Sequence, residues 1–381
     1  MNDIKDLTLK ELEQILLSWG QESFHAQQIF SWIYKRKAKD FESMSDLSSD
    51  LRRHLKENFY LFDLKLARVF RSEDGTEKFL FELKDGNLIE AVTIPTEKRV
   101  TGCISTQVGC KFACRFCASG LLGFKRNLTS GEMIEEVLYL NPVRNTTALT
   151  GENKISNGVK NNSLSKKMTH LVFMGIGEPL DNYDNVIKAA RIINSPQALN
   201  IGARRITIST CGIIPAIRRL AQEDLQIELS ISLHAGNDKT RSLLMPINKK
   251  YPLRDLIQTS REYIRKTDRQ ITFEYVLIKG INSDLQNARI LSKILKGLNL
   301  CKINLIPANP VRNTKAIEGE DKISNGANPI KDGNVEPPEK SEILLFRDYL
   351  LKSGINVTLR KPRGQDIDAA CGQLRLHYEK R

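Results

Sequence analysis

The sequence predicts an α/β protein whose main body is a partial (βα)6 barrel of the TIM type, joined to a small N-terminal helical domain and a short β-rich extension. From about residue 102 onward, apolar β-rich runs alternate with helical patterns, and this alternation implies a parallel sheet. Short polar motifs follow several of these runs, at the strand ends where the active sites of such barrels gather. We therefore expect residues 102–363 to form the barrel and residues 364–381 to form a C-terminal tail.

Residues 1–60 are expected to form the helical domain. The stretch "TLKELEQILLSWG" opens with a threonine that can cap a helix and closes at Gly20, and "ESFHAQQIFSWIYKRK" repeats apolar residues at helical spacing. Residues 61–101 alternate like strands around the turn signals "EDGTE" and "KDGN", which predicts the β-rich extension.

The barrel elements follow in chain order. The expected strands are the β-rich runs 102–107, 170–175, 204–210, 227–235, 271–280, 302–308 and 355–361. The expected helices between them are 130–140, 184–194, 253–266, 285–298 and 341–354. This part of the chain is long enough for six βα units.

Composition and charge narrow the class of protein. The formal charge of +13 and the isoelectric point near 9.3 fit a polyanionic partner such as RNA, although a solvated basic surface explains the charge about as well. The helical domain carries basic groups in "RKAKD" and "LRRHLKE", so it is a candidate RNA-binding or accessory domain, or else a packing domain without contact to substrate. No run of about 18 uncharged apolar residues is present, and the N-terminal residues are polar, so we expect a cytoplasmic protein with no membrane association.

Two polar segments interrupt the barrel pattern. Residues 141–158 and 309–326 agree at 14 of 18 positions, although the sequences around them do not match. A duplicated barrel would repeat its apolar scaffold as well. We therefore interpret the copies as polar loop insertions, at 143–168 and 311–338, that project outward; a pair of RNA-binding elements is the alternative.

Four of the seven cysteines lie between residues 103 and 120, and in a reducing compartment such clusters more often ligate metal than form static disulfides. Cys110, Cys114 and Cys117 have the spacing C-x3-C-x2-C, with Phe116 before the last. A [4Fe-4S] cluster has four irons, so three thiolates leave one iron open to bind S-adenosylmethionine through its amino and carboxylate groups. This spacing is typical of the radical S-adenosylmethionine superfamily; a zinc site completed by Cys103 is the alternative.

Residues that follow the later barrel strands form a candidate cofactor-binding site. In "MGIGEP", glycine lets the backbone approach a cofactor, and the carboxylate can accept a hydrogen bond from an ammonium group. The candidates are Gly177, Glu178, Ser209, Ser232, Leu233, His234 and Asn309. Each one alone is a weak signal because strand ends are often polar, but together they line the predicted mouth of the barrel.

The chain resembles, almost from end to end, the RlmN family, which comprises the dual-specificity adenine C2-methyltransferases of 23S rRNA and tRNA. The resemblance rests on "FHAQQIFSWIY", "EAVTIP", "TGCISTQVGCKFACRFCASG", "VFMGIGEPLDNYDNV", "ITISTCGI", "SLHA", "INLIPANP" and "RGQDIDAACGQL". The Cfr-type C8-methyltransferases of the same rRNA adenosine use their cysteines in the same way and are the alternative within the superfamily.

The resemblance implies one [4Fe-4S] cluster on the three clustered cysteines and two molecules of S-adenosylmethionine per turnover. Cys371, in "DAACGQL", would first accept a methyl group, and a radical derived from the second S-adenosylmethionine would activate that group for addition to adenine. Glu90, in "EAVTIP", falls at the position of the family's proton acceptor. Cys103 falls at that of the resolving cysteine, which releases the product through a transient disulfide with Cys371. Residues 364–381 would then form a catalytic tail.

The resemblance also implies 23S rRNA and tRNA as substrates, an electron donor such as flavodoxin or ferredoxin, and a monomeric protein. No physical argument from the sequence separates C2 from C8 methylation. The alternative from another class is a zinc-stabilised RNA-binding protein without catalysis. We interpret Cys211 and Cys301 as small buried apolar residues.

Overall fold

The computed structural model describes residues 1–120, 123–141, 167–309 and 335–374. Nearly all of the predicted insertions 143–168 and 311–338 lies outside these residues, and so does the end of the tail, 375–381. The outward projection of the insertions therefore stays a prediction.

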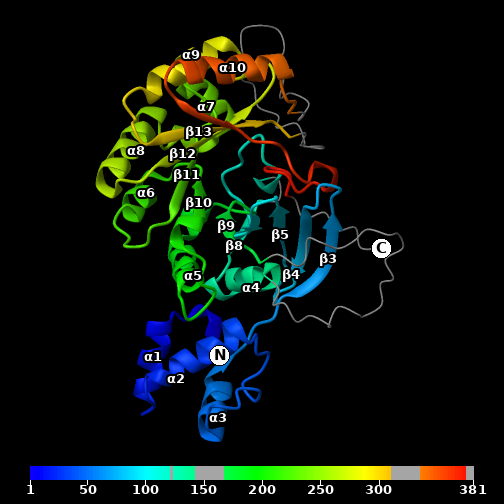
Figure 1. Ribbon diagram of the computed structural model, residues 1–381, viewed down its shortest axis with the longest axis vertical. Helices are drawn as coiled ribbons and strands as arrows, with labels where there is room; N and C mark the ends of the chain where they lie inside the picture. The colour runs from blue at the N-terminus through cyan, green and yellow to red at the C-terminus, as the bar shows by residue number, and fades with distance from the viewer. Residues whose placement is uncertain (121–122, 142–166, 310–334, 375–381) are drawn as a thin grey trace.

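A ten-stranded sheet forms the centre of the molecule (Figure 1). Its strand order is β14-β13-β12-β11-β10-β9-β6-β5-β4-β3, and the part from β14 to β6 is parallel. The parallel strands are β6 (Val100–Ile104), β9 (His170–Phe173), β10 (Ile206–Thr210), β11 (Glu228–Ser232), β12 (Ile271–Leu277), β13 (Cys301–Pro307) and β14 (Asn356–Leu359). In the described sheet β14 is an edge strand that does not pair with β6, so the predicted partial α/β barrel is confirmed.

Helices cover the outer face of the parallel strands (Figure 1). They are α4 (Ser130–Leu140), α5 (Tyr183–Asn194), α6 (Ile214–Leu220), α7 (Asp238–Leu244), α8 (Leu253–Thr267), α9 (Leu285–Leu295) and α10 (Lys340–Lys352). The sequence analysis missed α6 and α7, because each has only 7 residues and a helical period cannot stand out over two turns.

The N-terminal residues form the expected small helical unit next to α4 and α5 (Figure 1). Its elements are β1 (Asn2–Asp3), α1 (Leu9–Ser18), α2 (Phe24–Phe30), α3 (Ser49–Asn58) and β2 (Phe59–Tyr60). Thr8 caps α1 in a reciprocal capping box with Glu11, as the threonine signal predicted. Lys5 forms a buried ion pair with Glu135 of α4, which joins this unit to the barrel.

The predicted β-rich extension continues the barrel sheet. Strands β3 (Lys65–Arg71), β4 (Glu77–Glu82) and β5 (Leu88–Pro95) are antiparallel to one another, and β5 pairs antiparallel with β6. Val92 of β5 lies opposite both Lys78 of β4 and Cys103 of β6. Since directly paired residues project to the same side of a sheet, these three side chains share one face.

The C-terminal tail crosses from β14 to the extension (Figure 1). A small hairpin lies between β6 and α4 and consists of β7 (Gln107–Gly109) and β8 (Phe124–Asn127). Residues such as Ile208, Phe273 and Phe346 fill the core between sheet and helices. None of the helices within the described ranges is long and apolar enough to cross a membrane.

Candidate active site

The three clustered cysteines lie on one loop that follows β7. The Cys110 amide donates a hydrogen bond to the Gly123 carbonyl at 2.9 Å, and the Arg115 amide donates to the Leu244 carbonyl at the end of α7, also at 2.9 Å. Within the loop, the Cys117 amide donates a hydrogen bond to the Cys114 carbonyl at 3.0 Å. Backbone hydrogen bonds therefore fix the loop at both the hairpin and the barrel.

The chemistry of this loop fits an iron–sulfur cluster. Burial raises the pKa of the Cys110 thiol to about 12, and burial followed by the nearness of Cys117 and Cys110 raises the pKa of Cys114. A bound metal would hold such thiols as thiolates. Within the described ranges, no three His, Cys, Asp or Glu side chains converge closely enough to hold one metal ion. A cluster binds its thiolates through separate irons, so these three cysteines could hold one without such convergence.

Gly177 and Glu178 follow β9, just after a strand, as the sequence predicted. Gly177 has φ 109°, and a Cβ atom there would lie 2.6 Å from the Gln107 side chain, so only glycine fits. The buried Glu178 carboxylate accepts hydrogen bonds from the amides of Leu180, at 3.0 Å, and Cys211, at 2.7 Å. The bond from Cys211 connects the ends of β9 and β10. Burial raises the pKa of Glu178.

The next candidates lie on neighbouring strands. Ser209 is on β10, Ser232 ends β11, and Leu233 follows it. His234 has φ 55°, and its Nδ1 accepts a hydrogen bond from the Val276 amide at 3.0 Å. Burial, with a smaller effect from a nearby arginine, lowers the pKa of His234 to about 3, so its ring is neutral.

Phe116 of the cysteine loop packs edge-to-face on the His234 ring, with centroids 4.5 Å apart. This contact places the cysteine loop against the residues that follow β11. Glu178, which follows β9, is also near enough to Cys110 and Cys114 to contribute to the rise in their pKa values, so His234 and Glu178 are the predicted residues that lie by the cysteine loop.

Arg241 of α7 binds the backbone at this end of the barrel. The sequence patterns did not point to it. It is fully buried. Its guanidinium donates to the carbonyls of Cys211 at 2.8 Å, Ser232 at 3.1 Å and Leu233 at 3.2 Å. Arginine at the surface of a short helix is common, so only its burial in the tertiary structure reveals this role.

The C-terminal tail rests on the cysteine loop. The Ala118 amide donates to the Gly372 carbonyl at 2.7 Å, and the Ser119 hydroxyl to the Leu374 carbonyl at 3.1 Å. Gly372 has φ 83°, and a Cβ atom there would lie 2.7 Å from the Phe116 carbonyl oxygen. A side chain at this position would therefore push the tail, and Cys371 with it, away from the loop.

Asn309, predicted as a cofactor contact, also holds the tail. Its Nδ2 donates to the Cys371 carbonyl at 3.0 Å, and its Oδ1 accepts from Gln365 Nε2 at 2.8 Å. Both bonds lie at the point where β13 ends, so the position of Cys371 depends on the mouth of the barrel.

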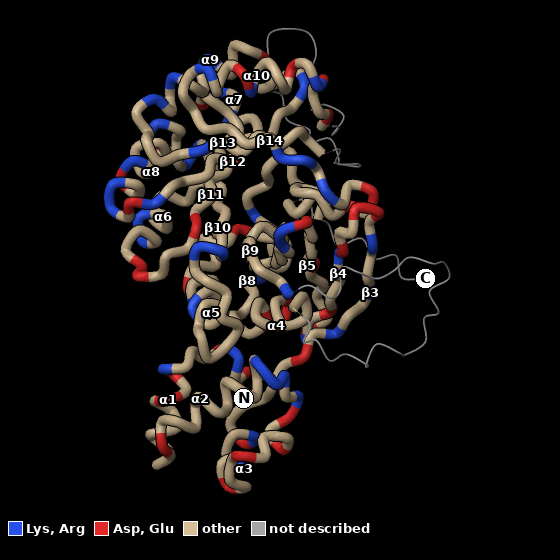
Figure 2. The backbone as a smooth tube through the Cα atoms, viewed as in Figure 1, with Lys and Arg blue, Asp and Glu red and all other residues tan. Residues whose placement is uncertain are grey.

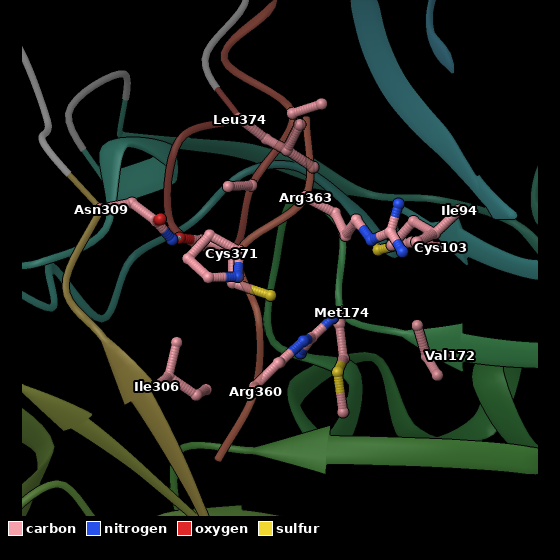
Figure 3. A pocket seen from close by; sticks show the side chains of 13 residues that line it. Ile94, Cys103, Val172, Met174, Ile306, Asn309, Arg360, Arg363, Cys371 and Leu374 are labelled. Atoms are coloured by element: carbon pink, nitrogen blue, oxygen red, sulfur yellow. Dashed lines mark hydrogen bonds between the residues drawn. The ribbon is translucent and has the colours of Figure 1, made fainter. Parts of the chain in front are cut away.

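Cys103 and Cys371 line one pocket, together with Met174, Asn309 and Arg360 (Figure 3). Burial raises the pKa of Cys103 to about 12, with a further rise from Cys371 and an opposing effect of Arg360. The nearby Cys371 in turn raises the pKa of Arg360. The structure thus separates Cys103 from the cysteine loop and brings it to Cys371, two residues far apart in the sequence.

Arg360 is a further site residue that the sequence analysis missed. It follows the last barrel strand, where a basic residue has no distinctive pattern. Its proximity to both cysteines places a positive charge in the pocket, and that charge opposes the rise that burial causes in the pKa of Cys103.

Glu90 lies on β5 and is almost fully buried. Its Oε1 is 3.3 Å from the Lys78 ammonium group of β4, and its backbone carbonyl accepts from the Ser105 hydroxyl at 2.6 Å. In the alternating pattern of β5, Glu90 lies on the same face as Val92, and therefore on the same face as Cys103.

Known protein families match two parts of this chain. Residues 2–61 match the family described as ribosomal RNA large subunit methyltransferase N-terminal domain, and residues 104–288 match the radical SAM superfamily. A "Probable dual-specificity RNA methyltransferase RlmN" from Clostridium novyi is 44% identical over 379 residues, which cover 99% of this chain and 99% of the relative. A protein of the same name from Staphylococcus aureus (strain JH9) is 42% identical, with 98% of this chain and 92% of the relative covered.

A solved structure has the same fold. The crystal structure of a radical SAM methyltransferase from Sphaerobacter thermophilus superposes with a TM-score of 0.83 at 40% identity, covering 98% of this chain and 99% of that one. Identity at these levels over nearly the whole chain shows that the protein belongs to the RlmN family of the radical S-adenosylmethionine superfamily.

Proposed function

We propose that this protein is an S-adenosylmethionine-dependent RNA methyltransferase that methylates carbon 2 of adenosine in 23S rRNA and in tRNA. The observation that carries the proposal is the pocket in which Cys371 meets Cys103 and Arg360 while the same tail rests on the cysteine loop. The relatives named dual-specificity RNA methyltransferases RlmN support the choice of RNA as substrate.

Cys110, Cys114 and Cys117 would hold the [4Fe-4S] cluster that the superfamily implies. The bound cluster supplies the electron that makes S-adenosylmethionine a hydrogen-abstracting reagent. Two molecules of S-adenosylmethionine are used per turnover in this proposal, one as methyl donor to Cys371 and one as the source of the radical.

The remaining steps use Cys371 and Cys103 of the pocket and Glu90 of β5. The Cys371 thiolate, beside the Arg360 guanidinium, attacks the methyl group and carries it. Once this carbon is bonded to adenine C2, the radical adduct loses one electron, which the bound cluster would take back, and Glu90 accepts the C2 proton. The Cys103 thiolate then attacks the Cys371 sulfur: the S–S bond forms as the carbon–sulfur bond breaks, and the electron pair stays with the carbon, which gains a proton to become the methyl product.

Basic side chains near the pocket suit the phosphates of an RNA substrate. Arg363 lines the pocket, Lys361 is exposed on the same segment after β14, and Lys98 and Arg99 are exposed in the turn that follows Ile94. Figure 2 shows the basic segment after β14. Such contacts are independent of base sequence, so they fit an enzyme that uses two kinds of RNA, with the target base extruded from its stack.

The test is a reaction of anaerobically reconstituted protein with S-adenosylmethionine, reduced flavodoxin or ferredoxin as electron donor, and either 23S rRNA or tRNA. We expect mass spectrometry of the digested RNA to show 2-methyladenosine from both substrates, and none with Cys371→Ala. Cys301→Ala, at a buried cysteine distant from the pocket, is the matched control and should behave as wild type. 8-Methyladenosine instead would overturn the C2 assignment, and unmodified RNA from iron-loaded protein would overturn the activity.

A further inference from the structure

The turn between β3 and β4 binds the C-terminal tail. The Ser72 hydroxyl donates to Asp366 Oδ1 at 2.6 Å, and the Glu73 amide donates to Asp366 Oδ2 at 3.3 Å. In the other direction, the Gly364 amide donates to Asp74 Oδ2 at 3.0 Å. The β-rich extension therefore contributes to the placement of the tail that carries Cys371.

Lys78 of β4 is a buried residue that contacts both the C-terminal tail and Glu90. Its side chain is only 5% exposed. Its ammonium nitrogen lies 3.3 Å from Glu90 Oε1 and 3.3 Å from the Asp368 carbonyl oxygen of the tail, and it lies 4.8 Å from the centre of the Phe70 ring. One buried cation thus contacts the candidate base and the tail at the same time.

The chemistry of a buried carboxylate gives this cation a specific effect. A carboxylate taken out of water is costly unless an opposite charge lies beside it, and without that charge it binds a proton. A protonated Glu90 could not accept another proton. An ammonium group has three N–H donors, so Lys78 can hold the Glu90 carboxylate and the Asp368 carbonyl together.

We propose that Lys78 is a positioning residue that keeps Glu90 ionised and couples it to the docked tail. This inference rests on the proposed function. Lys78 itself need not touch RNA or S-adenosylmethionine. It acts on the one step that needs a base, the release of methylated RNA from Cys371.

Other bonds hold the tail when Lys78 is replaced. Asn309, Ala118 and Asp74 each bind the tail backbone independently of Lys78. Methyl transfer to Cys371 should therefore survive the loss of Lys78, whereas release should not. This separation distinguishes a positioning role from a general loss of structure.

The experiment compares Lys78→Met and Lys78→Arg in the reconstituted enzyme with S-adenosylmethionine, reductant and RNA. Lys65→Met is the matched control, because Lys65 pairs with Glu82 on the same sheet but its side chain is 72% exposed. Mass spectrometry of the peptide that contains Cys371 measures its methylation. A denaturing gel measures the covalent protein–RNA adduct, and mass spectrometry of the digested RNA measures the released methylated product.

For Lys78→Met we expect normal methylation of Cys371, accumulation of the adduct, and release slowed by about tenfold or more, because a positioned base contributes about 10²–10⁴ in rate. Lys78→Arg should restore release by returning the charge, and Lys65→Met should match wild type. If Lys78→Met is insoluble, Lys78→Gln is the uncharged variant and the same results are expected of it.

Release at the wild-type rate by the uncharged variant would overturn the inference. So would an equal loss of Cys371 methylation and release without adduct, or a Lys78→Arg enzyme as slow as the uncharged one. Wild-type enzyme that yields no methylated adenosine would instead contradict the proposed function, so the two failures are distinguishable.

Discussion

Asp74 offers a direct test of how the tail is held. The two hairpin turns of the extension each contain an Asp-Gly pair, and in each the aspartate Oδ1 accepts from the amide two residues later: Thr76 at 2.9 Å for Asp74, and Asn87 at 3.0 Å for Asp85. Only Asp74 also binds the tail, through Oδ2 and the Gly364 amide at 3.0 Å. Asp74→Asn keeps the shape and the turn acceptor but replaces this second oxygen by an NH2 group.

The size of the effect follows from these contacts. A hydrogen bond to a charged group contributes about 1.5–3 kcal/mol. The Asp74 side chain is 29% exposed, so water can replace part of the bond, and we expect a loss of about 1–2 kcal/mol for the docked tail. This corresponds to a rise of about 5–30-fold in the undocked population.

Hydrogen exchange measures this population, because an amide protected only in the docked tail exchanges in proportion to the opening equilibrium. In Asp74→Asn, amides of residues 364–374 should exchange about 5–30-fold faster than in wild type, with little change in the helices of the barrel. Asp85→Asn is the matched control: Asp85 binds Arg126 and its own turn, and within the described part of the tail, residues 364–374, it has no hydrogen-bond partner, so exchange of these residues should stay at the wild-type rate.

Two results would refute the reasoning. One is unchanged exchange of the tail in Asp74→Asn, which would mean that the turn does not hold it. The other is equal acceleration by Asp85→Asn, which would show that the effect comes from loss of a turn carboxylate in general.

Three further predictions concern the site. Cys110→Ser should abolish the visible absorbance of the reconstituted cluster, whereas Cys301→Ser should retain it; a brown Cys110→Ser protein with full iron content would contradict the assignment. Cys103→Ala should accumulate a protein–RNA adduct that denaturing gels detect, because no thiolate can then attack the Cys371 sulfur, and product release from this variant would exclude Cys103 from that role. The pKa of His234 is lowered from its ordinary value to about 3, so the unfolded state binds a proton that the folded state does not, and the free energy of unfolding should fall by up to about 1.4 kcal/mol per unit as pH drops below about 6.5. Denaturant titrations at pH 7 and pH 5 should show a smaller fall for His234→Gln, and equal falls would argue against a neutral buried histidine.

Local sequence patterns predicted most of the elements and part of the site. Capping, turn and helical signals span only a few residues. For this reason the sequence predicted the cap at Thr8, the two Asp-Gly turns and the helix α4. The cysteine loop could be recognised for the same reason, because three cysteines within eight residues of chain form a local pattern. Family resemblance added Glu90, Cys103 and Cys371, whose catalytic roles are still proposals.

The sequence by itself therefore determined the α/β class, the order of the barrel strands and of the longer helices, and the spacing of the three clustered cysteines, since periodicity, capping and cysteine spacing act over short distances along the chain. Only the tertiary structure decided that β5 continues the barrel sheet, that Arg241 holds three strand-end carbonyls, and that Arg360 and Lys78 lie beside the tail. These contacts join residues that are distant in sequence, and a lysine or arginine that will be buried looks the same in the sequence as one that will be solvated. Burial and partner choice arise only when the chain has folded, and they give these charges their chemical effect.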